Sequence, residues 1–474
     1  MPALRRPEQI EHLELPPRRA QVGGMADVLV VGGGPAGLGA ALGAAQAGAD
    51  VVLAERYSFL GGNATAALVM PLMSFHTQHP PAEPVPDADS LLPTDHGPGD
   101  PILAGVVSRL LERLVRAGGA RPPSIETGYT VPFDPEVLKL VALELLDEAG
   151  VRFLFHAFAS GVICDDARVT GVVFETKSGP VVLHAKTVID CTGDGDVAAQ
   201  AGAPYDVGRP EDGLTQPMTL MFRMVEFERE AFAEYVRRHP DQWRGVHGLW
   251  DLIREATARG ELELPREDLL FFATPHAREV AVNSTRITGK LGIDVWDLTY
   301  AEWQSRRQLR QIVHFLERYV PGFARAYAVQ SGTTIGVRET RRIRGDYQLT
   351  TEDVLIARKF DDVIARCSYP IDIHNPRGSG TLLRRLPRGE SYDIPLRCLL
   401  PQAVEGLLVA GRCISGTHAA LSSYRVMPVA MAIGQAAGVC AALAARAGMR
   451  PRAVPHREVQ QELTRQGADL RGVV

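Results

Sequence analysis

The sequence predicts an α/β fold in which a Rossmann-type nucleotide-binding domain carries a β-meander and contains an inserted α+β domain. Three observations predict it: a glycine-rich turn between an apolar strand and a helix near the N-terminus, three β-rich runs after residue 150, and a second strand, glycine turn and apolar helix near the C-terminus. At 474 residues the chain also exceeds what one hydrophobic core usually organises, so we expect two domains.

Residues 1–24 form a polar, proline-containing extension, and the predicted fold begins after them. The apolar run 27–31 predicts a buried strand that ends in three glycines. An alanine-rich stretch over 35–48 predicts a helix, and residues 51–54 predict a second buried strand. Together these elements predict a βαβ unit.

The turn inside this unit matches the GxGxxG pattern. Gly32 permits a tight turn, Gly34 leaves space for a pyrophosphate beside the backbone, and Gly37 lets the helix pack closely on the strand. The helix that begins at Pro35 and Ala36 would direct N–H donors and a partial positive charge at the pyrophosphate. A dinucleotide is therefore expected here.

An acidic residue, Glu55, ends the second strand at the spacing where a carboxylate accepts hydrogen bonds from the ribose of the adenosine half. We include its neighbour Arg56 among the expected cofactor contacts. A glycine-rich turn without a ligand is the alternative interpretation. The order of strand, glycines, helix, strand and acid argues against that alternative.

The middle of the chain predicts a loop, two helices and the meander. Residues 76–101 contain many Pro, Asp and His without periodicity and predict a long surface loop, a candidate lid. Helices are expected over 102–117 and from Pro135 to a stop at Gly150. Three β-rich runs separated by turns predict the meander: 151–158, 169–175 and 181–189.

The character of the sequence changes after residue 208. Aromatic and charged helices follow, such as 300–319, for which Thr299 and Glu302 predict a capping box. The strand predicted over 406–410 and the helix from about Pro428 then return to the first domain. The predicted divisions are an extension over 1–24, a cofactor domain over 25–208 and 391–474, and a substrate domain over 209–390.

Composition narrows the function classes. The net charge of −5 and the absence of a basic run argue against nucleic acid as a partner. Six dispersed cysteines without a CxxC pair predict reduced thiols in a cytoplasmic protein and no metal site. The first twenty residues lack the apolar stretch of a secretory signal, so we expect no export. The apolar stretch 426–445 contains Gln435 and many small residues, and predicts a buried core helix rather than a membrane span.

On these motifs, residues 25–75 resemble the N-terminus of FAD-binding oxidoreductases of the glutathione-reductase-like group. Nearly all of the chain after residue 25 is similar to FAD-dependent oxidoreductases related to fumarate reductase and succinate dehydrogenase flavoproteins. Besides the first glycine turn, the resemblance rests on a second glycine segment, a third loop and a C-terminal motif whose helix faces the flavin pyrimidine edge. The FAD contacts that it implies are Gly61, Gly62, Asn63, Ala64, Thr65, Thr192, Gly193, Asp194, Gly411, Arg412, Arg425, Val426 and Met427.

Two further segments, 336–342 and 369–374, resemble parts of the family that face the substrate. Because hydride transfer at flavin N5 accompanies proton movement on a neighbouring atom, a histidine should lie beside the substrate, and an arginine could clamp a carboxylate. A purely structural pairing of Glu339 with Arg341 or Arg342 is the alternative, and Cys413 is expected to be a packed, inert thiol. The candidates for catalysis are His374, His418, Arg338, Arg342, Arg425 and Tyr369.

These features predict an FAD-dependent oxidoreductase that transfers hydride between flavin N5 and a small organic substrate, at a C–C, C–N or C–O bond. The alternatives are an FAD-dependent monooxygenase or halogenase, a tRNA-modifying flavoprotein, and a non-catalytic FAD-binding protein. The segment after His418 lacks the His-Gly of fumarate reductases, which argues against dicarboxylates, and no flavin-tethering histidine is evident, so noncovalent FAD is expected. No second GxGxxG is present for NAD(P)H, and a homodimer is the default expectation.

Overall fold

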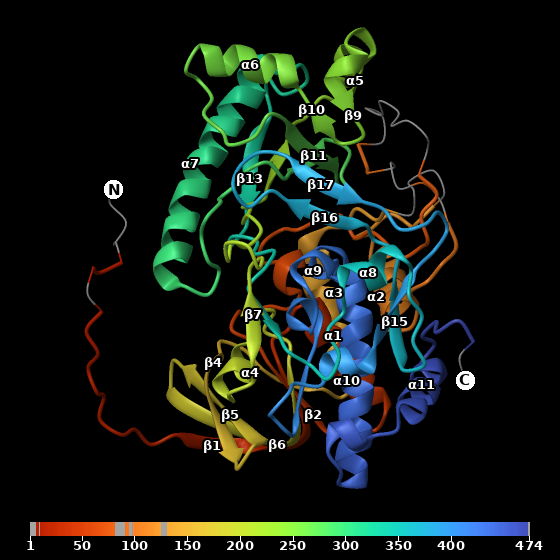
Figure 1. The fold of residues 1–474 in the computed structure, drawn as a ribbon. Coiled ribbons are helices and arrows are strands. Elements are labelled where there is room, and N and C mark those ends of the chain that lie inside the picture. Colours follow the sequence, from red (N-terminus) through yellow and green to blue (C-terminus); the bar gives the residue numbers. More distant parts are fainter. Residues whose placement is uncertain are drawn as a thin grey trace.

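A sheet of seven strands forms the base of the protein in the computed structural model (Figure 1). The structure describes residues 6–8, 10–80, 91–93, 97, 99–124 and 130–472. Strand order is β3-β2-β1-β6-β5-β4, and β19 pairs with β6 in parallel. The bounds are β1 Gln21–Val31, β2 Val51–Ala54, β3 Arg152–Leu154, β4 Phe158–Asp165, β5 Arg168–Thr176, β6 Gly179–Asp190 and β19 Leu407–Val409.

The βαβ unit is confirmed, and the strand at 406–410 joins the same sheet. Strand β1 pairs in parallel with both β2 and β6, and the C-terminal β19 extends this parallel core. β1 also begins at Gln21, inside the segment predicted as an extension, because Gln21 and Val22 pair with Val181 and Val182 of β6. Residues 10–20 before it are an exposed segment without helix or strand (Figure 1).

The first strand predicted for the meander, 151–158, is wrong. The run divides into β3, which pairs in parallel with β2, and β4, which begins at Phe158 and pairs antiparallel with β5. His156 lies between them with φ of 55°, a left-handed conformation that interrupts an extended run. The observed meander is therefore β4, β5 and β6, shifted along the chain from the predicted one.

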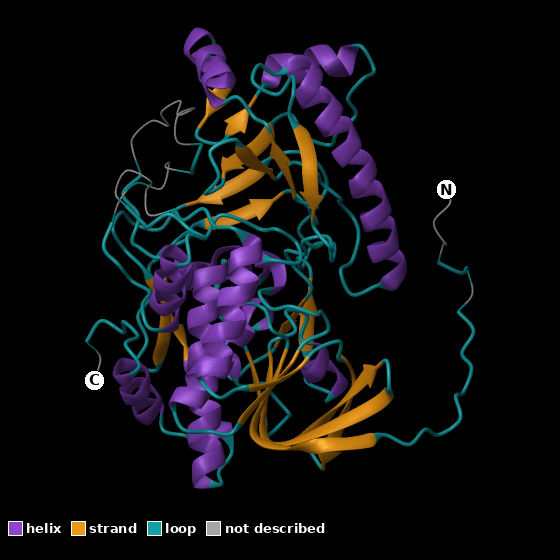
Figure 2. Ribbon diagram, turned by 180° about the vertical axis from the view of Figure 1, so that it is seen from behind, coloured by secondary structure: helices purple, strands orange, loops and turns teal. Residues whose placement is uncertain are grey.

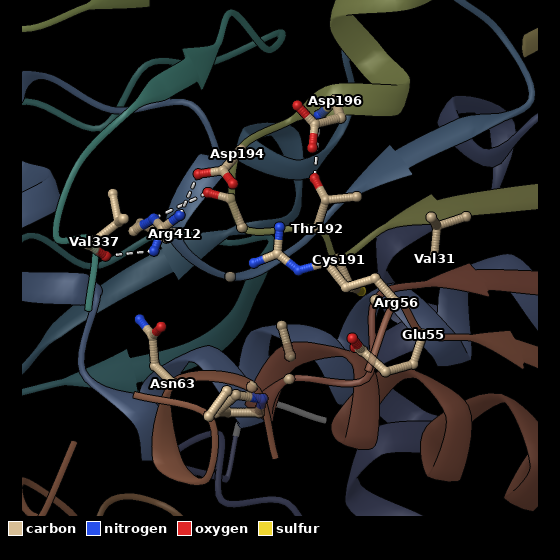
Figure 3. Close-up of a pocket in the computed structure, with 18 of the residues that line it drawn as sticks. Val31, Glu55, Arg56, Asn63, Cys191, Thr192, Asp194, Asp196, Val337 and Arg412 are labelled. Carbon is tan, nitrogen blue, oxygen red and sulfur yellow. Dashed lines mark hydrogen bonds and ion pairs between the residues drawn. The ribbon is translucent and has the colours of Figure 1, made fainter. Parts of the chain in front are cut away.

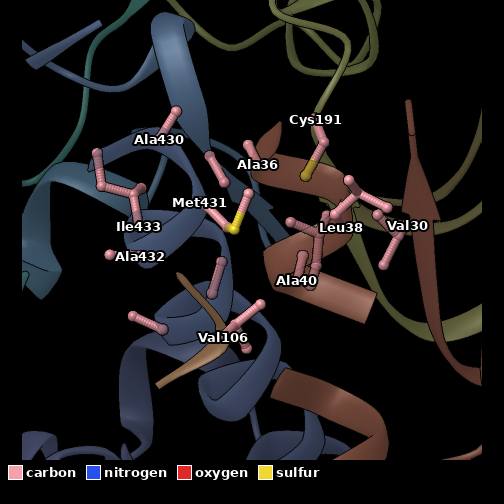
Figure 4. Packing of buried hydrophobic residues seen from close by; sticks show 14 of the residues in the cluster. Val30, Ala36, Leu38, Ala40, Val106, Cys191, Ala430, Met431, Ala432 and Ile433 are labelled. Carbon is pink, nitrogen blue, oxygen red and sulfur yellow. The ribbon is translucent and has the colours of Figure 1, made fainter. Parts of the chain in front are cut away.

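Two helices, α1 (Pro35–Gln46) and α10 (Met427–Ala447), cross beside this sheet with their backbones in close approach (Figures 1 and 4). A Cβ built on Gly434 would lie 1.9 Å from the Ala36 carbonyl oxygen, and one on Gly438 would lie 2.1 Å from that of Ala40. Helix α10 is long and apolar enough to cross a membrane, but 94% of its most apolar window is buried within the protein. Burial against α1 explains why the residues of α10 are apolar and often small.

A second, six-stranded sheet lies above the central helices (Figure 2). Its order is β13-β8-β12-β11-β10-β9, and all of its pairings are antiparallel. Aromatic side chains fill its core, including the fully buried Trp243 and Phe271. The bounds are β8 Phe222–Val225, β9 Trp243–Arg244, β10 His247–Gly248, β11 Leu269–Ala273, β12 Glu279–Val282, β13 Tyr327–Ser331, α5 Arg229–Arg238, α6 Trp250–Ala258 and α7 Val295–Tyr319.

The long helix α7 begins earlier than the sequence predicts. Asp294 is its N-cap, and the Asp294 carboxylate accepts hydrogen bonds from the N–H groups of Trp296 and Asp297 at 3.0 and 3.1 Å. The capping box predicted from Thr299 is wrong, since the Thr299 hydroxyl donates to the Val295 carbonyl oxygen from within the helix. A stronger carboxylate cap five residues earlier decided the start.

The core of the second sheet is built from residues between Phe222 and Ala326, together with Leu91 and Leu92. Residues Ile343 to Tyr392 belong to the segment predicted as the substrate domain but contribute side chains such as Ile343 and Val363 to the larger core. The remaining bounds are α2 Val106–Arg116, α3 Pro135–Glu148, α4 Asp196–Gln200, β7 Tyr205–Val207, β14 Arg341–Ile343, α8 Thr351–Leu355, β15 Val363–Cys367, β16 Ile371–His374, β17 Thr381–Arg384, β18 Tyr392–Pro395, α9 His418–Tyr424 and α11 His456–Arg465.

The candidate lid over 76–101 falls largely outside the described residues, which omit 81–90, 94–96 and 98. Within the described part, His76 and Pro101 form an isolated bridge, and the Thr77 N–H donates to the Asp100 carbonyl oxygen at 2.8 Å. The two ends of the segment therefore lie side by side.

Replacing Gly438 by alanine should lower the free energy of unfolding by about 1–3 kcal/mol, because the new methyl group would meet the Ala40 carbonyl oxygen and force α1 and α10 apart. Gly161→Ala on β4 is the control, since its Cβ would lie 3.4 Å from Val173, an ordinary contact. Denaturant unfolding of both variants measures the difference. Equal stabilities would contradict this account of the helix contact.

Candidate functional site

The turn from β1 into α1 is pressed against the loop that follows β6. Gly32 has φ of 102°, and a Cβ there would lie 2.5 Å from the Cys191 carbonyl oxygen. A Cβ on Gly37 would lie 1.8 Å from the Gly32 carbonyl oxygen. Only glycine fits these two positions, and Pro35 then begins α1, whose first N–H groups face the turn.

Glu55 fixes the end of β2 against this turn. The buried Glu55 carboxylate accepts hydrogen bonds from the N–H groups of Gly33 at 2.6 Å and Tyr57 at 2.9 Å. Burial raises the pKa of Glu55, and the two backbone hydrogen bonds oppose that rise. The carboxylate keeps further lone pairs for a ligand in the cleft beside it (Figure 3).

The second glycine segment packs directly against the first, and the two border one groove of a cleft. A Cβ on Gly34 would lie 3.6 Å from the Gly62 Cα, and one on Gly62 would lie 2.7 Å from the Gly34 Cα. The Thr65 hydroxyl donates to the Leu60 carbonyl oxygen at 2.6 Å and closes the loop. Two bare stretches of backbone thus border one space, which suits a pyrophosphate.

Arg412 ties the third loop to the C-terminal motif (Figure 3). Its guanidinium donates to the carbonyl oxygens of Gly193 at 3.0 Å and Val337 at 2.5 Å, and it forms an ion pair with the Asp194 carboxylate. Three segments far apart in sequence are held together by one side chain. Arg412 therefore shapes the cleft through its protein partners.

One cleft receives residues from all four predicted cofactor segments. The predicted residues that line it are Gly32, Gly34, Pro35, Ala36, Glu55, Arg56, Gly62, Asn63, Thr192, Gly193, Asp194, Gly411, Arg412, Arg425 and Met427. Gly37, Gly61, Ala64 and Thr65 are not among its lining residues; Gly37 and Thr65 shape the backbone behind it. Val426 lines the neighbouring cavity instead.

The sequence model of the FAD dependent oxidoreductase family matches residues 27–463. The chain belongs to this family. The protein is an FAD-dependent oxidoreductase, and its cofactor is FAD. It has the Rossmann-type fold that the sequence predicts. The bare glycine groove, the helix N-terminus and the acid at the end of β2 fit that cofactor.

Two curated relatives match part of the chain. It is 31% identical over 182 residues to the thiamine thiazole synthase of Methanococcus aeolicus, which covers 36% of this chain and 57% of the synthase. It is also 31% identical over 203 residues to the thiamine thiazole synthase of Aeropyrum pernix, covering 39% and 65%. The chain thus spans less than two thirds of these relatives.

Solved structures of flavoenzymes are similar over most of the chain. The flavin-dependent brominase Bmp2 is 12% identical with a TM-score of 0.47, over 94% of this chain and 84% of its own. The p-nitrophenol 4-monooxygenase PnpA from Pseudomonas putida is 14% identical with a TM-score of 0.43, over 93% and 83%. At these identities the likeness concerns the fold alone.

A second cavity adjoins the cleft of the cofactor segments and contains several predicted catalytic residues. Arg338, Tyr369, His374 and Arg425 line it, together with Asp372. The Asp372 carboxylate accepts a hydrogen bond from the Tyr369 hydroxyl at 3.1 Å and lies 3.4 Å from an Arg425 guanidinium nitrogen. The cavity therefore combines hydrogen-bond donors, acceptors and charge beside that cleft.

His374 is held neutral in this cavity. Burial lowers the pKa of His374 well below its usual value, and the surrounding guanidiniums of Arg338, Arg425 and Arg286 lower it further. Its Nδ1 lies 3.3 Å from Arg286 Nη2 and 3.3 Å from the Thr381 hydroxyl. Because a guanidinium can only donate, Nδ1 accepts from Arg286, and the proton of the imidazole resides on Nε2.

His418 and Arg342 lie elsewhere. They line a different cavity, and buried Glu339 forms an ion pair with Arg342 and lies 2.8 Å from His418 Nδ1. Arg342 also donates to the carbonyl oxygens of Gly208 and Gly416. The structural interpretation of Glu339 thus has direct contacts in its favour, and Cys413 is likewise a buried thiol whose pKa burial raises.

Sequence reasoning missed several residues of the second cavity. Arg286 follows the buried strand β12, while Arg266, Asp268 and His247 come from loops and a short strand of the second sheet. Arg286 follows the polar residues Asn283, Ser284 and Thr285, so neither it nor the other three carried a signal in the local sequence. Asp196 lines the cleft of the cofactor segments and is not among the predicted cofactor contacts.

Gly34→Val should greatly reduce bound FAD with little loss of stability. The valine side chain would enter the groove opposite Gly62, where the nearest protein atom to the new Cβ is 3.6 Å away. Flavin absorbance per protein and the melting temperature of the apoprotein measure the two effects. A variant that retains full FAD occupancy would exclude this groove as the pyrophosphate site.

FAD should bind more tightly at pH 5 than at pH 7. Burial, together with the negative charges of Asp194 and Asp190, raises the pKa of Asp196 to about 6, against the opposing effect of Arg341. Since FAD is an anion, proton uptake by Asp196 and FAD binding favour each other as the pH falls through about 6. Quenching of FAD fluorescence measures the dissociation constant. The dissociation constant should depend less on pH in Asp196→Asn. An unchanged pH dependence would show that another group is responsible.

Proposed function

We propose that FAD binds in the cleft built by the four cofactor segments, and that the enzyme transfers hydride between flavin N5 and a small organic substrate in the adjoining cavity. One observation carries the proposal: the two cavities share a border. Asn63, Val337, Arg412, Arg425 and Met427 line both. A flavin ring that extends across that border on its ribityl chain would meet a substrate on the far side.

The N-terminus of α10 lies at this shared border. Met427 and Pro428 begin the helix, its N-cap Val426 has no capping side chain, and these residues line the second cavity. Unpaired N–H groups and the positive end of the helix dipole stabilise a developing anion. Bound FAD supplies hydride chemistry at N5, and α10 supplies N–H donors for the negative charge of the reduced form.

We assign proton exchange with the substrate to His374 and Asp372. His374 carries its proton on Nε2, which lies 3.6 Å from an Asp372 carboxylate oxygen. The Tyr369 hydroxyl and Arg425 hold that carboxylate in place. Nδ1 of the neutral imidazole receives a proton when the hydrogen bond from Arg286 to it breaks. The imidazolium that forms is stabilised by the Asp372 carboxylate and can return the proton, so the pair serves dehydrogenation and reduction alike.

We further propose, from the sequence, that the enzyme is cytoplasmic and forms a homodimer.

An experiment can distinguish the proposed dehydrogenase or reductase from a monooxygenase or halogenase. A dehydrogenase is reduced directly by its substrate without oxygen, whereas a monooxygenase or halogenase needs a separate electron donor and oxygen.

Anaerobic mixing of the FAD-loaded protein with small acids, amines and alcohols tests the proposal. Bleaching of the flavin band by one substrate class without NAD(P)H is the expected result. Bleaching only by NAD(P)H, followed by oxygen consumption with an aromatic substrate, would instead establish a monooxygenase. A protein that never binds FAD would overturn the assignment of the cleft.

Replacing His374 by glutamine should slow anaerobic flavin reduction by about 10²–10⁴-fold, the usual contribution of a positioned proton-transfer group. FAD content should stay unchanged, because His374 lines the second cavity and not the FAD cleft. Stopped-flow absorbance measures the reduction rate, with His418→Gln as the matched control. Equal effects of the two substitutions would refute the separate placement of these histidines.

A further inference from the structure

We propose that Arg286 and Arg338 form a binding site for a carboxylate group of the substrate. This inference rests on the proposed function, since it concerns the same cavity. It depends on how the charges of the cavity are paired. Five arginines line this cavity: Arg266, Arg286, Arg338, Arg412 and Arg425.

Three of these arginines already have a carboxylate partner. Arg266 lies 2.9 Å from an Asp268 oxygen, and Arg425 lies 3.4 Å from an Asp372 oxygen. Arg412 is paired with Asp194, as described above. The charges of these three guanidiniums are offset by the protein itself, so none of them requires an anionic ligand.

Arg338 has no carboxylate partner among the residues that the structure describes. One of its terminal nitrogens, Nη1, donates to the Pro217 carbonyl oxygen at 2.8 Å and to the Thr219 hydroxyl at 2.6 Å. Both acceptors are neutral, and no hydrogen bond from Nε or Nη2 is found within the described part of the chain. Burial, with the charges of Arg425 and Arg286, lowers the pKa of Arg338 to about 9.

Arg286 likewise has only neutral hydrogen-bond partners among the described residues. It is buried, and its Nη1 donates to the carbonyl oxygens of Gly378 at 2.7 Å and Gly380 at 3.3 Å. Its Nη2 donates to His374 Nδ1, and across the described ranges it too lacks a salt bridge. Burial lowers the pKa of Arg286 to about 10. Two guanidiniums thus face one cavity without a counter-ion.

A buried cation is stabilised by an anion that enters with it, and the planar guanidinium matches the two oxygens of a carboxylate. The five arginines of the cavity are opposed by four carboxylates, those of Asp194, Glu267, Asp268 and Asp372, which leaves one positive charge in excess. A singly charged carboxylate matches that excess better than a doubly charged phosphate does. Arg286 also contacts His374, so a carboxylate on this pair would lie next to the proposed proton-exchange group. The charge pattern therefore favours an organic acid.

Matched acid and amide probes test this inference on the FAD-loaded protein. Acetate, butyrate and benzoate are titrated beside acetamide, butyramide and benzamide, and binding is followed by the flavin difference spectrum and by calorimetry. At least one acid should bind, with its amide bound about tenfold or more weakly, because only the acid pairs with a charged guanidinium. Failure of all three acids to bind would overturn the inference.

Arginine variants test which residues bind the carboxylate. Arg286→Gln and Arg338→Gln should each weaken binding of the acid by about tenfold to a hundredfold. Arg237→Gln, on the exposed face of α5 and paired with Glu230, should bind it as the parent does. Binding that survives the double variant Arg286→Gln/Arg338→Gln, or stronger binding of inorganic phosphate than of any acid, would refute the carboxylate site.

These outcomes are separate from those of the proposed function. If an uncharged substrate bleaches the flavin and none of the acids binds, the proposed function stands and the carboxylate site is refuted. If benzoate binds through Arg286 and Arg338 but the protein takes up no FAD, the carboxylate site stands and the proposed function is refuted. Calorimetry on the apoprotein distinguishes the second case.

Discussion

The close contact between α1 and α10 is the constraint on which the rest of the structure depends. Both helices approach each other through glycines whose missing side chains make room for carbonyl oxygens of the partner helix. This contact brings the N-terminus of α1 and that of α10 to the same cleft, although nearly four hundred residues of sequence separate them. Gln435 of α10 accepts from the Val106 N–H of α2 at 3.2 Å and donates to Gln466 at 3.0 Å. Gln466 in turn donates to the Gly43 carbonyl oxygen of α1 at 3.0 Å, which reinforces the contact between the two helices.

Arginine serves three distinct purposes around the two cavities. Arg412 joins segments through backbone carbonyls and Asp194, and Arg342 neutralises Glu339 deep in the protein. Arg286 and Arg338 keep their charge without a carboxylate among the described residues. The sequence shows the same residue type in each place, and only the partner of each guanidinium distinguishes a structural role from a binding role.

The charge of the second cavity also affects the protonation of His374. Burial lowers the pKa of His374, and the guanidiniums that favour an anion lower it further because they disfavour a second positive charge. An anionic substrate that offsets this charge would make His374 a better proton acceptor at the moment of binding. In the proposed function, substrate recognition and proton transfer would be coupled through the contact between Arg286 and His374.

The sequence by itself determined the βαβ unit, the glycine groove, Glu55 and the C-terminal strand and helix, because local patterns such as Gly32, Gly34 and Gly37 require that geometry wherever they occur. A family resemblance also predicted His374 and Arg338 as candidates for catalysis. Only the tertiary structure separated His418 and Arg342 from them, added Arg286, and placed the start of α7 at Asp294. Pairing of charges and the sharing of a cavity are long-range properties, and no local sequence pattern encodes which side chains meet after folding.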